Sequence, residues 1–233
     1  MLDTQKRKLI RNSGLLYFLL AVTAPFGLMY VPEQIFVRGD IAATAANIRN
    51  MEGMLRLGIA SELFHQAVAI FLVVALYKMF KPVNEGQAKL LVILGALVSV
   101  PIMYLNVLNW VAALMLAGDG IPLASISRDQ ADTLAYLFMR LHGHGVIIAS
   151  TFWGLWLFPF GILIIQSGFI PKILGYGMFI AGIAYTAYSF IAFVTPDLLP
   201  KVETAAMVME FCEVPTLLWM FGRGLVPLRK VPA

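Results

Sequence analysis

The chain has 233 residues, of which 60% are hydrophobic and only 13% are charged, and its formal net charge is +4. A soluble domain is about 45–50% apolar and about 25% charged, and one core of this size could not bury the additional apolar surface. The 12% of aromatic residues excludes a disordered chain, and the presence of 1 cysteine excludes a disulfide scaffold. The composition therefore predicts a polytopic membrane protein.

Six stretches are apolar enough to cross a bilayer, which takes about 20 residues of helix. We therefore predict an all-α fold, a bundle of six transmembrane helices that forms a single domain over residues 1–233. The expected spans are about 9–31, 54–80, 88–117, 132–166, 172–195 and 203–222. The fourth span is the longest, and Pro159 and the pair Gly143 and Gly145 are its expected bend points.

Two loops between the spans have signals of further helix. Asp40 is an expected N-cap for a short helix over 41–50, which would lie at the outer surface of the membrane. The segment 127–130 (SRDQ) fits a capping box, so the fourth helix is expected to begin outside the bilayer.

Basic residues gather in alternate loops, and the positive-inside rule places such loops in the cytoplasm. They are Lys6, Arg7, Lys8, Arg11, Lys78, Lys81, Lys89, Lys172, Arg223, Arg229 and Lys230. The opposite loops carry Glu33, Asp40, Glu52, Asp119, Asp129, Asp132, Asp197 and Glu203. We therefore expect both termini in the cytoplasm. The basic anchors would contact anionic lipid, and no basic stripe indicates a nucleic-acid partner.

Polar side chains within the spans are the candidate site, because ionisable groups are costly in hydrocarbon. The candidates are Glu62, His65, Asn106, Asn109, Arg140, His142, His144, Glu210 and Glu213. At about 1.5 Å of rise per residue, four helices would place these groups in one layer in the outer half of the membrane. The layer predicts a pocket that binds a small molecule, an ion or a proton.

Spacing along each helix predicts which candidates share a face. Three pairs are three residues apart and therefore share one: Glu62 with His65, Asn106 with Asn109, and Glu210 with Glu213. Arg140 and His144 are four residues apart and also share a face, whereas His142 points about 200° away from Arg140. We favour Arg140 with His144 as the pair that faces the site, because three glutamates there need a positive charge.

The charge balance leaves three ligand classes open. With neutral histidines the layer lacks about two positive charges, and it would take up protons or bind a cation. A divalent metal is the second alternative, with Glu62, His65, His144, Glu210 and Glu213 as ligands and a metal-dependent membrane enzyme as the activity. Haem, held by His65 with His142 or His144, ranks behind the metal.

A structural role is the remaining alternative. Buried ion pairs often fix the register of helices, and a histidine in a span often bonds only to a neighbouring helix. The chain would then be a non-catalytic subunit of a membrane complex, with other membrane proteins or a second copy of itself as partners. The inner halves of the spans are almost wholly apolar, which argues against a transport path through the membrane.

Several segments resemble the bacterial membrane proteins of the family known as domain of unknown function 4386. They are 39–48 (GDxAATAxNI), 55–58 (LRLG), 75–78 (ALYK), 81–84 (KPVN), 141–142 (LH), 152–157 (FWGLWL), 167–172 (SGFIPK) and 174–175 (LG). The resemblance implies a bacterial inner-membrane protein and supplies no activity. It includes Arg56 and His142, so it makes Arg56 a candidate partner for an outer carboxylate.

Overall fold

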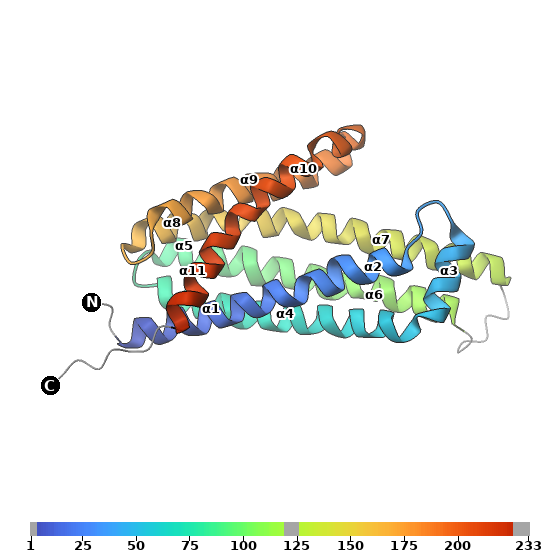
Figure 1. The fold of residues 1–233 in the computed structure, drawn as a ribbon, viewed down its shortest axis with the longest axis horizontal. Coiled ribbons are helices and arrows are strands. Elements are labelled where there is room, and N and C mark those ends of the chain that lie inside the picture. The colour runs from blue at the N-terminus through green and yellow to red at the C-terminus, as the bar shows by residue number, and fades with distance from the viewer. Residues whose placement is uncertain (1–3, 119–125, 226–233) are drawn as a thin grey trace. The chain divides into compact units, whose positions relative to one another are not determined.

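The computed structural model describes residues 4–118 and 126–225, and every regular element in these ranges is a helix (Figure 1). Six helical spans are long and apolar enough to cross a membrane: Arg7–Ile35, Glu52–Phe80, Glu85–Ala117, Arg128–Ser167, Lys172–Val194 and Pro196–Arg223. The chain is therefore a multi-pass membrane protein, and the predicted six-helix, all-α class is confirmed. Asp119, Arg229 and Lys230, which entered the orientation argument, lie outside the described residues.

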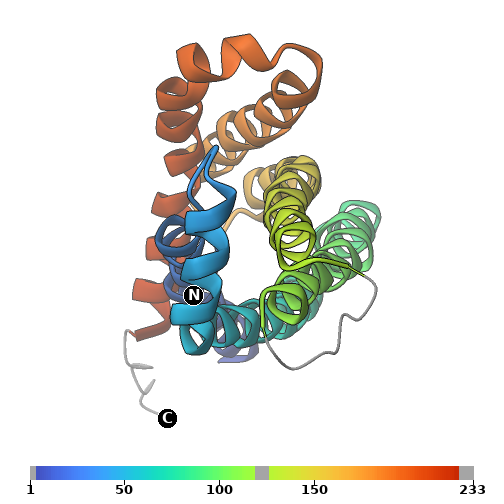
Figure 2. The ribbon, with the colours of Figure 1, turned by 90° about the vertical axis from the view of Figure 1, so that its right-hand side faces the viewer.

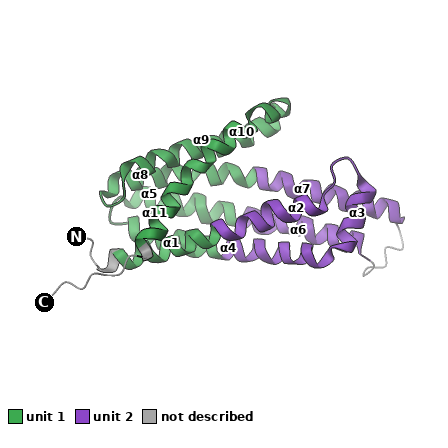
Figure 3. Ribbon diagram, viewed as in Figure 1, with its two compact units in different colours: residues 1–20, 68–100, 148–233 green, residues 21–67, 101–147 purple. Residues whose placement is uncertain are grey.

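The chain divides into two compact units, which Figure 3 shows in green and purple. Unit 1 consists of residues 1–20, 68–100 and 148–233, and unit 2 of residues 21–67 and 101–147. Each unit has its own hydrophobic core, so each is described separately below.

Unit 2 is built from four helical spans and one short helix. It contains the end of α1 (Thr4–Pro25), the π-helical turn η1 (Phe26–Tyr30), α2 (Val31–Ile35), α3 (Ile41–Asn50) and parts of α4 (Glu52–Phe80), α6 (Ser99–Ala117) and α7 (Arg128–Leu155). Its core packs Val31, Ile35, Ile48, Leu55, Trp110, Ala113, Ala117, Ala135 and Met139. Most of these residues recur at helical spacing, so each span turns one apolar stripe inward.

The short helix α3 is the predicted helix of the first loop. The Asp40 side chain accepts a hydrogen bond from the backbone N–H of Ala43 at 2.8 Å, which confirms the predicted N-cap. Ile48 and Ala45 are buried, whereas Ile41 is exposed. Figure 1 shows α3 turned across the direction of α2 and α4, and Figure 2 looks onto this end of unit 2.

Unit 1 contains the remaining helices. They are α5 (Glu85–Val92), η2 (Ile93–Val98), α8 (Leu157–Ser167), α9 (Lys172–Val194), η3 (Pro196–Leu198), α10 (Leu199–Glu210), η4 (Phe211–Glu213) and α11 (Val214–Leu225), with the other parts of α1, α4, α6 and α7. The core centres on Phe80, Phe160 and Leu163. The helices α8 and α9 pack closely, because a Cβ at Gly161 or at Gly175 would lie 2.8 Å from the carbonyl oxygen of the other.

The sixth span begins earlier than predicted, and the fourth span is interrupted. The sixth span begins at Pro196 and not at 203, because prolines at first-turn positions start both η3 and α10. The fourth span breaks once, at Trp156 between α7 and α8, as expected from Pro159, which has no N–H to offer the preceding turn. The helix α7 continues without a break through Gly143 and Gly145.

Candidate functional site

A buried contact between a histidine and a glutamate joins two helices in unit 2. His142 Nε2 of α7 lies 3.0 Å from Oε1 and 3.1 Å from Oε2 of Glu62 on α4, and the hydrogen bond is directed at Oε2. Both side chains are 2–3% exposed. Glu62 is brought inside because it continues the buried stripe of α4 that contains Leu55, Gly58 and Gln66. Burial of a carboxylate is costly without such a partner.

Two groups on α6 hold the imidazole in place. The indole of Trp110 stacks on the ring of His142 with centroids 4.1 Å apart and an interplanar angle of 27°. The Asn106 amide donates to the backbone carbonyl of His142 at 3.0 Å, and the Asn109 amide donates to Oδ1 of Asn106, also at 3.0 Å. Asn106 therefore holds the backbone of His142, and Asn109 supports Asn106.

Three glycines make room for these side chains. A Cβ at Gly145 would overlap the amide group of Asn106. A Cβ at Gly27, in the π-helical turn η1, would lie 3.1 Å from Cγ of Glu62, and one at Gly58 would lie 2.7 Å from the indole of Trp110. Short π-helical segments occur often beside functional sites, and here the turn lets backbone approach the buried carboxylate.

His65 has a partner other than Glu62. Its Nδ1 lies 3.0 Å from Oγ1 of Thr23 on α1, and the Ser61 hydroxyl donates to the Thr23 carbonyl at 3.4 Å. The i,i+3 spacing of Glu62 and His65 therefore leads to two different contacts within unit 2. His65 links α4 to α1, and Glu62 links α4 to α7.

The structure buries the face of α7 opposite to the one that the sequence predicts. Arg140 and His144 are exposed, and the buried face of this helix carries Ala135, Met139 and His142 instead. The physical reason is the cost of burial: a neutral imidazole can be stacked and hydrogen-bonded inside, whereas a guanidinium cannot lose its charge. Arg56 contacts a carboxylate, as the resemblance implies, and that carboxylate is Glu52 at 2.8 Å on the exposed surface of α4.

A second polar cluster lies in unit 1 around Glu213. The Tyr17 hydroxyl of α1 donates to Oε2 and the Tyr185 hydroxyl of α9 donates to Oε1, both at 3.2 Å. Tyr17 is itself packed edge-on against Trp156, with centroids 6.4 Å apart. Glu213 ends the 3-10 turn η4, and Glu210 precedes that turn at the end of α10.

The nine candidates are thus divided between the two units. Glu62, His65, Asn106, Asn109, Arg140, His142 and His144 belong to unit 2, and Glu210 and Glu213 belong to unit 1. The contacts within each unit supply no single site that contains all nine residues. In the described residues, no three His, Cys, Asp or Glu side chains gather closely enough to hold a metal ion.

Sequence reasoning missed the aromatic members of both clusters. Trp110 lies one helical turn from Asn106, and Tyr17 is a hydroxyl within an apolar span. The spacing of Trp110 and the hydroxyl of Tyr17 were the signals available in the sequence. Aromatic residues within spans are, however, usually core or lipid contacts.

The comparisons with known proteins give a family and no activity. A model of the family described as "Domain of unknown function (DUF4386)" matches residues 13–224. No curated protein and no solved structure matches the chain significantly.

Proposed function

The chain belongs to the DUF4386 family, and from the buried pair in unit 2 we propose that it is a proton-binding membrane protein whose site is Glu62 with His142. The observation that carries the proposal is the position of one imidazole nitrogen within 3.1 Å of both carboxylate oxygens, with both side chains almost completely buried. A carboxylate and an imidazole in one dry site exchange protons readily, because each stabilises the charged form of the other.

The proton balance of the site is simple. Before proton uptake, a neutral imidazole donates its Nε2–H to the Glu62 carboxylate. After uptake, the second ring nitrogen carries the added proton, and an imidazolium faces the same carboxylate. Trp110 stacks on the ring in either state, and Asn106 fixes the backbone of His142. Proton uptake therefore changes the charge of the imidazole ring without a change of fold.

The length of the fourth span supports access to water from one side. The span Arg128–Ser167 has 40 residues, whereas about 20 residues of helix cross the hydrocarbon. Residues 146–165 contain no ionisable group and match that length. His142 lies about one turn from the end of this run that is nearer to α3, so we propose that protons reach the pair from the aqueous phase at the α3 end. We propose that this end faces outward and that the membrane is the bacterial inner membrane.

A metal-dependent enzyme is not proposed. The Glu62–His142 pair supplies two ligands, and a metal site that is bound by protein alone takes about four. Haem would need a free histidine nitrogen, and the Nε2 of His142 faces Glu62.

The proton site can be tested by following the ring nitrogens of the histidines, since the chain has only 3 of them. The protein would be labelled with ¹⁵N-histidine, purified in detergent and studied by NMR over a pH series, with His65→Gln and His144→Gln to assign the signals. In Glu62→Gln the side-chain amide replaces the carboxylate that faces Nε2, so the His142 ring signals should respond to pH differently from those of the unaltered protein.

Glu52→Gln is the matched control, because this glutamate lies on the same helix but is exposed and paired with Arg56. The control should leave the His142 transition unchanged. If Glu62→Gln also leaves it unchanged while His142 remains folded in its place, the two groups do not share a proton and the proposed function is wrong.

A further inference from the structure

Unit 1 contains a carboxylate that the proposed function does not use. Glu213 accepts one hydrogen bond on each of its oxygens, from Tyr17 on α1 and from Tyr185 on α9, both at 3.2 Å. Tyr17 is buried, and Glu213 and Tyr185 are half-buried. Two helices therefore direct their hydroxyl groups at one titratable side chain on the turn between α10 and α11.

Two close approaches of backbone hold the segment that carries this carboxylate. A Cβ at Gly177 of α9 would lie 2.6 Å from the carbonyl oxygen of Cys212, the residue before Glu213. A Cβ at Gly14 of α1 would overlap the carbonyl group of Met220 on α11. Because glycine has no Cβ, η4 packs against α9, and α11 packs against α1. The segment is thus fixed between the two helices that carry the phenol partners.

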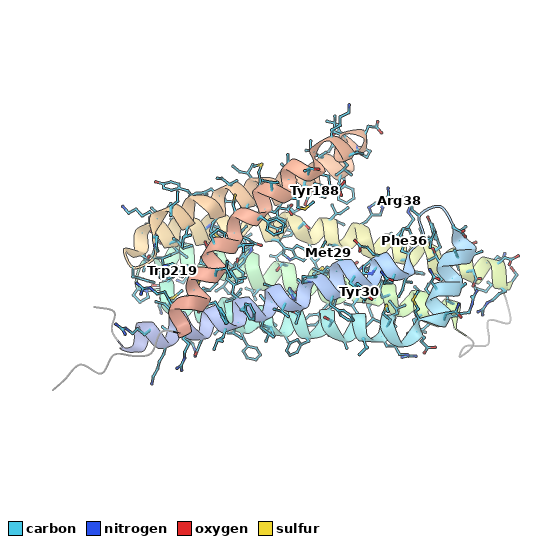
Figure 4. All side chains as sticks on the ribbon, viewed as in Figure 1. Met29, Tyr30, Phe36, Arg38, Tyr188 and Trp219 are labelled. Carbon is cyan, nitrogen blue, oxygen red and sulfur yellow. The ribbon has the colours of Figure 1, made fainter. Side chains whose placement is uncertain are left out.

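No basic side chain is paired with Glu213 among the residues that the structure describes. The runs on either side of it, 204–209 (TAAMVM) and 214–222 (VPTLLWMFG), contain no basic residue. Beyond these runs, the span has Lys201, which is exposed, and Arg223, whose guanidinium lies 5.7 Å from the ring of Trp219 (Figure 4). An ionised carboxylate without a cation is costly in hydrocarbon, so Glu213 needs a positive charge.

A proton is the positive charge that this geometry accommodates. The groups that meet here are the two oxygens of the carboxylate and the two phenol oxygens, and each phenol directs its hydrogen at the carboxylate. Calcium and magnesium ions take about six or more oxygen ligands, whose lone pairs must face the ion. A proton needs only one carboxylate oxygen and a neighbouring acceptor, and each phenol supplies such an acceptor.

We propose that Glu213 is a second proton-binding site, with Tyr17 and Tyr185 as its hydrogen-bonding partners. In the ionised state both phenols donate to the carboxylate. When a proton from water binds to one oxygen, that oxygen becomes a donor, and the phenol beside it turns its own hydrogen away and accepts instead. The other phenol continues to donate. The proposal concerns unit 1 and does not depend on the Glu62–His142 pair.

Few other groups in the described residues can share this proton. The titratable groups around Glu213 are Tyr17 of α1, Tyr185 of α9 and Glu210 of α10, and α11 has no ionisable residue before Arg223. Glu210 lies three residues before Glu213 in the sequence. Two carboxylates so close in the sequence repel each other when both are ionised, which favours the uptake of one proton.

Infrared spectra of the full chain in lipid follow this proton directly, because a protonated carboxyl has a C=O stretch that a carboxylate lacks. Over a pH series we expect a carboxyl band that weakens as the pH rises and that is lost in Glu213→Gln. Glu203→Gln is the matched control, because Glu203 is exposed on the same span, and it should retain the band. A band that is constant over the series, or one that Glu213→Gln retains, would overturn the proposal.

Two phenol variants keep the carboxyl and remain informative if Glu213→Gln does not fold. Tyr17→Phe and Tyr185→Phe each remove one donor from the ionised form. At the pH where the unaltered protein has half of the band, each should therefore raise its intensity, by at most about twofold. Tyr176→Phe, an exposed tyrosine of α9, should change nothing. If both phenol variants equal this control, the phenols do not hold the proton and the proposed site is wrong.

Two further spectra separate this site from its alternatives. Glu62→Gln should leave the Glu213 band unchanged, so failure of the proposed function and failure of the second site are distinguishable. Replacement of choline chloride by sodium chloride at constant pH should also leave the band unchanged. If sodium removes the band, the carboxylate exchanges its proton for a metal ion, and a site for protons alone is wrong.

Discussion

Two glycines of α7, two residues apart, are in opposite surroundings. A Cβ at Gly145 would overlap the Asn106 amide, whereas one at Gly143 would meet nothing within 4 Å. We expect Gly145→Ala to lower the free energy of unfolding by about 1–3 kcal/mol, because Asn106 must move and its bond to His142 is strained. Gly143→Ala should be neutral or stabilise the helix by about 0.5–1 kcal/mol.

Thermal unfolding in detergent and the His142 ring signals check this prediction together. Gly145→Ala should lower the melting temperature and shift the His142 signals, and Gly143→Ala should do neither. Equal melting temperatures for the two variants would contradict the close approach of α6 and α7 at Asn106.

The choice between His142 and Arg140 shows what sequence resolves at the residue scale. Helical spacing correctly indicates that the two side chains point in opposite directions. It does not indicate which of them is inside, and a count of charges favoured Arg140. The structure buries His142 because the indole of Trp110 covers the ring and Glu62 binds one nitrogen. Such a choice depends on neighbours from other helices, which spacing along one helix does not contain.

At the scale of elements, Glu213 joins three helical segments of unit 1. Tyr17 on α1 and Tyr185 on α9 each donate a hydrogen bond to this carboxylate at the end of η4. Removal of the donor from a buried acceptor costs about 1–3 kcal/mol, so Tyr17→Phe and Tyr185→Phe should each lower the free energy of unfolding by about that amount. The double variant should lose more than either single variant, since the two hydroxyls bind different oxygens.

Tyr176→Phe is the control for this pair, because Tyr176 lies on α9 with Tyr185 but is 54% exposed. Its melting temperature should equal that of the unaltered protein. If Tyr185→Phe also leaves the melting temperature unchanged, the Tyr185 hydroxyl does not stabilise Glu213, and the cluster in unit 1 is only a packing contact.

The spans themselves are predictable because length and hydropathy are properties of single segments. The positions at which the spans are interrupted are harder to predict. Pro159 indicates the break near Trp156, since a missing N–H is visible in the sequence. The π-helical turns Phe26–Tyr30 and Ile93–Val98 have no such residue signal. In η1 the turn coincides with the close approach of Gly27 to Glu62, a tertiary contact that overrides local preference.

At the scale of the molecule, depth along each helix does not decide which polar groups meet. An estimate of depth placed Glu213 in one layer with Glu62, yet Glu213 has Tyr17 and Tyr185 as partners in unit 1. Tyrosine was not counted as a polar partner, because its ring is apolar. Polar groups in hydrocarbon take whichever donor lies nearest, so the pairing follows the packing of helices and not the spacing of charges.

The basic residues at the two ends of the spans predict the orientation of the molecule. Arginines also occur at the α3 end, but Arg49, Arg56 and Arg128 lie beside Asp132 or Glu52. Lys81 and Lys89 at the opposite end are likewise paired, with Glu85, so the number of lysines and arginines at each end decides and not their pairing. The opposite loops carry an excess of lysine and arginine over acidic residues, as at 78–89 with Lys78, Lys81 and Lys89 against Glu85. The α3 end should therefore face away from the cytoplasm.

Single cysteines at the two ends test this orientation in a Cys212→Ser background. Arg38, which Figure 4 labels between α2 and α3, and Lys81, between α4 and α5, are both exposed basic residues outside helices. In intact cells a membrane-impermeant maleimide should label Arg38→Cys and should reach Lys81→Cys only after the membrane is permeabilised. The reverse pattern would place the termini outside and the Glu62–His142 pair near the cytoplasm, and the protons bound there would then come from the cell interior.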